Sequence, residues 1–237
     1  RSGDWGMPEE INRMVTDSIT NYFFTTSDVA NDNLKRGGVS EDRIFFVGNT
    51  MIDTLLANQE RFRPPSIWED ASLKASEYFV VTLHRPANVD EEGGFQKLLS
   101  AIVSCTKGLP VVFPVHPRTA KVLGGIKEQF PNLWLVEPLG YLEFNFLVKN
   151  AKAVITDSGG ITEETTVLGI PCMTLRDSTE RPETVSIGTN ELLGTDPSAL
   201  PSALDRLFDG QWKKGGIPEK WDGKAAERIV NVLETVL

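Results

Sequence analysis

Five short apolar segments recur in the chain after residue 78, and each is separated from the next by a segment long enough to form a helix. They span residues 79–83, 110–115, 133–136, 154–156 and 172–175. Strands that alternate with helices build a parallel sheet, because right-handed crossovers place the helices against its two faces. The sequence therefore predicts an α/β fold with a parallel sheet and helices on both faces.

The beginning and the end of the chain carry the patterns of further elements. From Pro8 onward, apolar residues recur at three- and four-residue steps, which predicts an amphipathic helix. Other elements are predicted as short strands at residues 23–25 and 43–47, the second of them buried, and as helices at 28–36, about 51–61 and 224–237. Pro64 and Pro65 make residues 62–67 the best linker candidate.

Composition excludes several classes of protein. The chain has 24 basic and 33 acidic residues and a net charge of -9, so we expect no nucleic-acid partner, which would need clustered Lys and Arg. No apolar run approaches the roughly 20 residues of a membrane helix and no signal-peptide pattern is present, so a cytoplasmic protein without a membrane partner is expected. Cys105 and Cys172 are too few for a disulfide framework. Two isolated histidines make a poor ligand set, and we expect no metal or other cofactor.

Polar residues follow four of the five predicted strands. In chain order they are His84 and Arg85, His116 and Arg118, Asp157 and Ser158, and Arg176 and Asp177. Ligands of open α/β sheets bind outside the carboxyl ends of the strands, so these side chains should converge on one rim. An imidazole there can shuttle a proton at a leaving phosphate. For His116, a plain turn or cap role is the alternative.

The segment from Ala153 to Glu183 indicates the kind of ligand. A short apolar strand is followed by Asp157, Ser158, Gly159 and Gly160 and then by a helix with Glu163 and Glu164 near its start. Glycines let a ligand approach the backbone, and the first N–H groups of a helix favour an anion such as phosphate. The acidic side chains can accept hydrogen bonds from sugar hydroxyls, although one of them would then only complement the helix dipole. Together with Arg181, which suits phosphate, this pattern predicts nucleotide-sugar binding.

Five motifs in this order resemble those of the UDP-N-acetylglucosamine 2-epimerase family, of the non-hydrolysing type. They read P-E-E-I-N-R from Pro8, V-G-N-T-M-I-D from Val47, L-H-R-P-A-N from Leu83, T-D-S-G-G-I-T-E-E from Thr156 and R-D-S-T-E-R-P-E from Arg176. The resemblance covers essentially the whole chain and implies a fold with two Rossmann-like domains, like that of GT-B glycosyltransferases. Residues 1–48 would then be the end of the N-terminal domain and residues 49–220 the C-terminal nucleotide-sugar-binding domain. Residues 221–237 would form a helix that crosses back to the first domain.

The resemblance also implies an activity and a set of site residues. Family members interconvert UDP-N-acetylglucosamine and UDP-N-acetylmannosamine by eliminating UDP to a 2-acetamidoglucal and returning it to the opposite face at C2. Glu9 matches an acid-base carboxylate and His84 the histidine near the diphosphate. The implied substrate-binding residues are Arg85, Leu139, Phe144, Ser158, Gly159, Gly160, Glu164 and Arg181, with Leu139 and Phe144 at the uracil. His116, Asp157 and Glu163 are further candidates on the same rim.

Other readings of the motifs stay open at this point. A hydrolysing epimerase, a GT-B-type glycosyltransferase and a non-catalytic UDP-sugar-binding module would share the phosphate turn. The resemblance implies further catalytic Asp and Glu residues upstream of Arg1, so we expect no useful epimerase activity from this chain alone. Because relatives of this type are commonly dimers, we also expect a homodimer.

Overall fold

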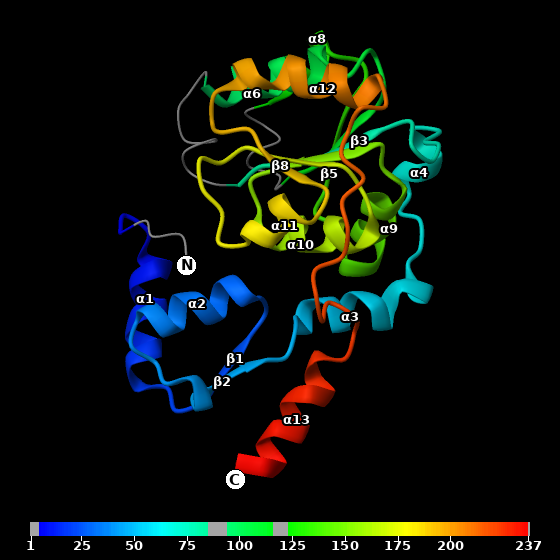
Figure 1. Cartoon of the computed structure of the whole chain (residues 1–237). Helices are drawn as coiled ribbons and strands as arrows, with labels where there is room; N and C mark the ends of the chain where they lie inside the picture. Colours follow the sequence, from blue (N-terminus) through cyan, green and yellow to red (C-terminus); the bar gives the residue numbers. More distant parts are fainter. Residues whose placement is uncertain (1–4, 85–93, 116–122, 237) are drawn as a thin grey trace.

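A parallel sheet of six strands forms the centre of the larger of two lobes (Figure 1). The computed structural model describes residues 5–84, 94–115 and 123–236. In spatial order the strands are β5 (Leu133–Val136), β4 (Val111–Pro114), β3 (Phe79–Thr82), β6 (Ala153–Thr156), β7 (Cys172–Thr174) and β8 (Asn190–Leu192). All five pairings are parallel, which confirms the predicted fold class. The edge strand β8 was not predicted, because it has a single apolar residue.

Helices cover both faces of this sheet. On the upper face in Figure 1 lie α6 (Gly94–Ser104), α8 (Gly124–Gln129) and α12 (Leu200–Phe208). On the lower face lie α9 (Tyr141–Asn150), α10 (Gly159–Leu168) and α11 (Pro182–Ser186). Successive residues of a strand point to opposite faces, so Phe79 and Val81 belong to the upper core while Val80 belongs to the lower one. Burial on both faces explains why the strands read as short unbroken apolar runs.

The smaller lobe is built from the first part of the chain. It contains α1 (Pro8–Ile19), β1 (Phe23–Thr25), α2 (Asp28–Arg36), the 3-10 turn η1 (Glu41–Arg43) and β2 (Ile44–Phe46). Strands β1 and β2 pair in parallel as a separate two-stranded sheet. The prediction that the second strand is buried was wrong, because Ile44–Phe46 are only half-buried. A sheet of two strands has too little structure around it to cover both faces.

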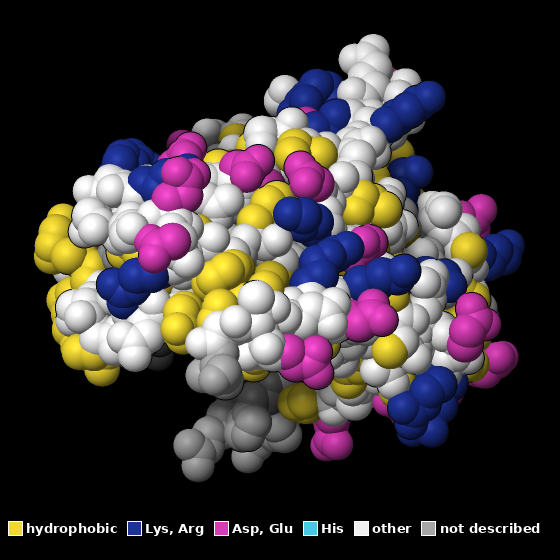
Figure 2. All heavy atoms as spheres, turned by 60° about the horizontal axis from the view of Figure 1, so that its bottom comes forward, with side chains coloured by type: hydrophobic (Ala, Val, Ile, Leu, Met, Phe, Trp, Pro, Cys, Tyr) yellow, Lys and Arg dark blue, Asp and Glu magenta, His cyan; other side chains and the backbone are white. Residues whose placement is uncertain are grey.

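One face of α1 exposes apolar side chains. Ile11, Val15 and Ile19 recur every four residues and are 46%, 59% and 80% exposed. Figure 2 shows hydrophobic side chains gathered at the left of the molecule, the end at which α1 lies in Figure 1. Within the described residues, nothing covers this stripe.

Two segments that connect the lobes pack against each other. The first segment follows β2 and runs through residues 47–49 into α3 (Thr50–Asn58), the 3-10 turn η2 (Gln59–Arg61) and α4 (Ile67–Asp70). The second follows the 3-10 turn η3 (Pro197–Ala199) and α12, and it returns the chain to α13 (Ala225–Val236). On the return segment, the buried Trp221 donates its indole N–H to the Thr26 carbonyl at 2.9 Å. Asp53 accepts the backbone N–H groups of Ala225 and Ala226 and so begins α13. The two connections therefore form one joint.

Gly48 is the tightest point of this joint, and its replacement by alanine tests the packing. Gly48 has φ +98°, and a β-carbon there would lie 2.1 Å from the Lys220 carbonyl oxygen. A left-handed backbone costs a non-glycine residue roughly 1–2 kcal/mol, and the clash adds to it, so we expect Gly48→Ala to lower the free energy of unfolding by about 3 kcal/mol. Equilibrium urea denaturation measures this loss.

The matched control is Gly38→Ala. Gly38 has φ +86°, but a β-carbon there would meet no atom within 4 Å. Gly38→Ala should therefore lower the free energy of unfolding only by the cost of the left-handed backbone, about 1 kcal/mol. Equal losses in both variants would show that the contact with Lys220 is not a constraint.

Candidate functional site

The candidate site lies where the chain changes direction through the sheet. From β3 the next strands are added on one side, and β6 then pairs with the opposite edge of β3. Ligands of open α/β sheets bind outside the carboxyl ends of the strands at such a switch point. His84 follows β3 and Asp157 follows β6, so both stand at this position. The structure thus brings two of the predicted residues into contact.

Asp157 orients the imidazole of His84. The Asp157 side chain is fully buried, and its Oδ1 lies 2.8 Å from His84 Nδ1. The backbone N–H of His84 also donates to Oδ2 of the same carboxylate at 3.0 Å. A carboxylate at Nδ1 fixes the ring orientation and stabilises the protonated imidazole. Because the His84 side chain is 64% exposed, the imidazole remains accessible to a ligand.

The turn after β6 forms an opening for an anion. Ser158 is the N-cap of α10, but its side chain makes no capping hydrogen bond to the helix. Its own backbone N–H donates to Thr156 Oγ1 at 2.9 Å. The first N–H groups of α10, from Gly159 onward, therefore lack a side-chain cap and suit an anionic ligand. A β-carbon on Gly160 would lie 3.2 Å from Met51 Cε, the end of a flexible side chain of α3.

A cavity of about 220 Å³ beside this turn is rich in arginine. It is lined by Arg13, Met51, Gly159, Gly160, Glu163, Arg176, Glu180 and Arg181. Arg176 is 5% exposed and pairs with Glu180 through two contacts of 3.0 Å, which is the two-pronged geometry that carboxylates and phosphates share. The sequence had indicated Arg181 and, less specifically, Arg176. Arg13 was missed, because only the folded chain brings α1 to this turn, and Glu180 was missed although it directly precedes Arg181.

Glu163 connects α10 with two distant segments. It is 2% exposed and accepts a hydrogen bond from Arg181 Nε. Asn49, at the start of α3, donates its Nδ2 to the same oxygen at 3.0 Å. Burial raises the pKa of Glu163, whereas Arg181 and Asn49 act to lower it. Glu163 therefore links Asn49, at the joint between the lobes, to Arg181 in the lining of the cavity.

Glu164 points to the other side of α10 and is held by α9. It is 6% exposed, and burial raises its pKa while hydrogen bonds from Tyr141 and Asn145 act to lower it. Leu139, just before α9, and Phe144, within it, are half-buried against the lower core of the sheet. Tyr141 and Asn145, which hold Glu164, and the half-buried Leu139 and Phe144 belong to the same short stretch of chain. An oriented carboxylate next to half-buried apolar side chains can hold a ligand that is polar on one side and flat on the other.

The remaining predicted residues have different outcomes. Glu9 is exposed on α1, while its neighbour Glu10 is 4% exposed and lies 3.5 Å from Arg13 Nη1. The buried carboxylate on this turn is therefore the one that the sequence analysis did not choose. Arg85 and His116 lie outside the described residues.

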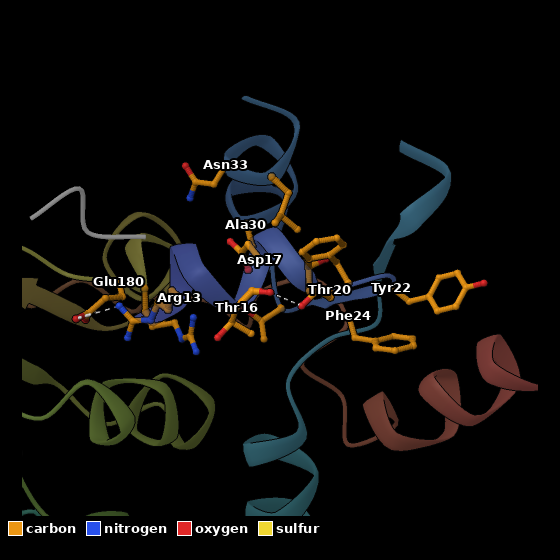
Figure 3. Close-up of a pocket in the computed structure, with 14 residues that line it drawn as sticks. Arg13, Thr16, Asp17, Thr20, Tyr22, Phe24, Ala30, Asn33 and Glu180 are labelled. Carbon is orange, nitrogen blue, oxygen red and sulfur yellow. Dashed lines mark hydrogen bonds and ion pairs between the residues drawn. The ribbon is translucent and has the colours of Figure 1, made fainter. Parts of the chain in front are cut away.

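A second cavity of about 390 Å³ lies between α1, β1 and α2 and reaches the first one. Arg13, Glu180 and Arg181 line both cavities. Figure 3 shows Arg13 from α1 next to Glu180 at one end of this space, with Tyr22 and Phe24 from the strand region at the other. The two cavities are therefore neighbours, with these three side chains between them.

Metal and membrane sites are not found in the described part of the chain. No group of three or more His, Cys, Asp or Glu side chains among these residues is placed to hold a metal ion. None of the helices in the ranges 5–84, 94–115 and 123–236 has the length and apolar character needed to cross a bilayer.

Comparisons with known proteins point in one direction. A profile of the UDP-N-acetylglucosamine 2-epimerase family matches residues 1–234. The UDP-N-acetylglucosamine 2-epimerase of Methanocaldococcus jannaschii is 39% identical over 245 residues, which cover 98% of this chain and 66% of that protein. The Escherichia coli K12 enzyme of the same name is 33% identical over 255 residues, with 99% and 66% covered. The chain therefore spans 66% of the length of these relatives.

Solved structures agree with this. The crystal structure of the M. jannaschii enzyme in complex with UDP-GlcNAc and UDP is similar with a TM-score of 0.84 and 38% identity, over 99% of this chain and 67% of that one. The Neisseria meningitidis enzyme bound to UDP-GlcNAc has a TM-score of 0.83 and 29% identity, over 96% of this chain and 65% of that one.

Glu183 offers a test of the electrostatics around the site. It is 4% exposed, and burial raises its pKa although a backbone N–H, Arg181 and Ser27 act to lower it. A raised pKa in the folded state stabilises the fold below the unfolded value of about 4.3 and loses that contribution as pH rises. We therefore expect Glu183→Gln to be about 1 kcal/mol more stable than wild type at pH 7 and equally stable at pH 4.

Urea denaturation at pH 4, 5.5 and 7 measures this difference. The control is Glu77→Gln, which removes a carboxylate that is exposed on the surface. An identical pH dependence in wild type and Glu183→Gln would refute the assignment of a raised pKa to Glu183.

Proposed function

The chain belongs to the UDP-N-acetylglucosamine 2-epimerase family, and from this premise we propose that it is the UDP-sugar-binding part of an enzyme that interconverts UDP-N-acetylglucosamine and UDP-N-acetylmannosamine. One observation carries the proposal. The capless start of α10, the arginine-lined cavity and the His84–Asp157 pair lie together at the switch point of the sheet. This combination supplies donors for a diphosphate and a proton-transfer group beside it.

In the proposed reaction, the diphosphate binds at Ser158–Gly160 with Arg181 as a charged donor. The bond between C1 and the UDP oxygen breaks while a base takes the C2 proton, which leaves UDP and 2-acetamidoglucal. UDP then returns to C1, and C2 receives a proton on the opposite face. Donors around the departing UDP stabilise the developing negative charge, and His84 holds or transfers a proton there. Glu9 is the proposed acid-base carboxylate of this chain.

The uridine is proposed to bind beside α9 and α10. Glu164 would accept hydrogen bonds from the ribose hydroxyls, and Phe144 with the backbone near Leu139 would contact the uracil. The support is geometric, because Glu164 is already oriented by Tyr141 and Asn145 of α9, and Phe144 is a half-buried residue of the same helix, directly before Asn145. The domain division at residues 48 and 220, the homodimer and the cytoplasmic location stay predictions.

A calorimetric titration of UDP into this chain tests the proposal. We expect saturable binding, and we expect Arg181→Gln to weaken it about tenfold, which corresponds to about 1.4 kcal/mol for one lost charged phosphate contact. Arg61→Gln is the matched control, because Arg61 is exposed and bonded to Asn58 within its own segment. No UDP binding by a folded sample would refute the proposed ligand.

The ribose contact has a separate test in the preference for UDP over 2′-deoxy-UDP. A buried acceptor that loses its hydroxyl partner is left unsatisfied, so wild type should prefer UDP about tenfold. Tyr141→Phe removes one hydroxyl that holds Glu164, so this variant should lose most of the preference for UDP. Tyr22→Phe, in the smaller lobe, should keep the full preference. A full preference in Tyr141→Phe would separate Glu164 from ribose recognition.

The reaction products distinguish a non-hydrolysing epimerase from the alternative functions. An epimerase that includes this chain should incorporate solvent deuterium at C2 of its UDP-sugars. Release of UDP with free N-acetylmannosamine would instead identify the hydrolysing type, and a requirement for an acceptor would identify a glycosyltransferase.

A further inference from the structure

Arg13 has a special position among the side chains around the proposed phosphate site. Of the described residues that line the cavity at the glycine turn, it alone comes from the smaller lobe. It also lines the larger cavity along α1 and β1. Arg13 therefore reaches from α1 across to the larger lobe, where Figure 3 shows it beside Glu180.

The ion pairs of Arg13 are long compared with those of its neighbours. Arg13 Nη1 lies 3.5 Å from Glu10 and 3.9 Å from Glu180, and its side chain is 42% exposed. Arg176, by contrast, is 5% exposed and makes two contacts of 3.0 Å with Glu180. Long, partly exposed ion pairs contribute little free energy. The Arg13 guanidinium can therefore exchange its present partners for a ligand at small cost.

The charges around the cavity favour such an exchange. Its lining contains three arginines and two glutamates. Glu163 is engaged by Arg181, and Glu180 is engaged at short distance by Arg176. Arg13 is thus the lining arginine with the longest ion pairs. A diphosphate offers oxygens that a guanidinium can bind through two parallel hydrogen bonds.

We propose that Arg13 binds the diphosphate of the nucleotide ligand from the side of the smaller lobe and gives up its long contact with Glu180 when it does so. The inference rests on the proposed UDP-sugar site and adds a binding residue to it. Both lobes then hold the same anion, because the α10 turn and Arg181 contact it from the larger lobe. Ligand binding consequently favours the arrangement in which α1 lies against the glycine turn.

The test compares UDP and uridine, which share the nucleoside and differ in the diphosphate. Arg13→Gln should weaken UDP binding about tenfold and leave uridine binding unchanged, and Arg13→Lys should restore part of the UDP affinity because it keeps the charge. The matched control is Arg36→Gln, since Arg36 lies on α2 and hydrogen-bonds within its own helix. Calorimetry measures the affinity for UDP, and ligand-observed NMR measures the affinity for uridine.

Each outcome decides between the proposals. Absence of UDP binding in wild type would overturn the proposed function. Normal UDP binding by Arg13→Gln, with wild type binding UDP, would overturn only the role of Arg13. An equal loss of UDP and uridine affinity in Arg13→Gln would show that Arg13 maintains the fold and does not bind the diphosphate. This result would also overturn the proposed role of Arg13.

Discussion

The pairing of β3 with β6 fixes the positions of the candidate site residues. All four residues of β3 are in register with those of β6, so both strands end at the same level. The residue after β6, Asp157, then has its carboxylate next to the first residues after β3. A buried carboxylate needs donors, and the backbone and imidazole of His84 supply them. The order of the strands therefore determines both where the site lies and why an aspartate is tolerated there.

Three carboxylates in and around this site are buried, which is energetically costly. Glu163, Glu164 and Glu183 are each at most 6% exposed, and burial raises the pKa of all three. Removal of a charge from water is unfavourable unless fixed partners replace the water. Glu163 and Glu164 have such partners on neighbouring segments, whereas Arg181 and Ser27 offset the burial of Glu183 only in part. Perturbed carboxylates concentrate at functional sites, and Glu163 is the one of these three that lines the cavity at the glycine turn.

The sequence was most informative where a local pattern decides the structure. The apolar runs predicted five strands of the sheet, and the small residues after Thr156 predicted the turn that begins α10. β8 was not predictable, because Asn190–Leu192 becomes a strand only through its pairing with β7. Arg13 and Asn49 were missed for a related reason. Their partners at the cavity, Glu180 for Arg13 and Glu163 for Asn49, lie more than 100 residues away in sequence, and no local periodicity reports such contacts.

The arrangement of these long-range contacts has a consequence for ligand binding. Asn49 belongs to the joint between the lobes, and its hydrogen bond to Glu163 connects that joint to Arg181. Arg13 connects α1 to the same cavity by a second route. Any anion that binds the cavity therefore acts on groups from both lobes. Because a ligand shifts an equilibrium only by its differential affinity for the two states, the coupling is strongest for an anion that both lobes contact at once. A diphosphate has enough oxygens to contact both lobes. The Glu180 carboxylate cannot do the same, because both of its oxygens already contact Arg176.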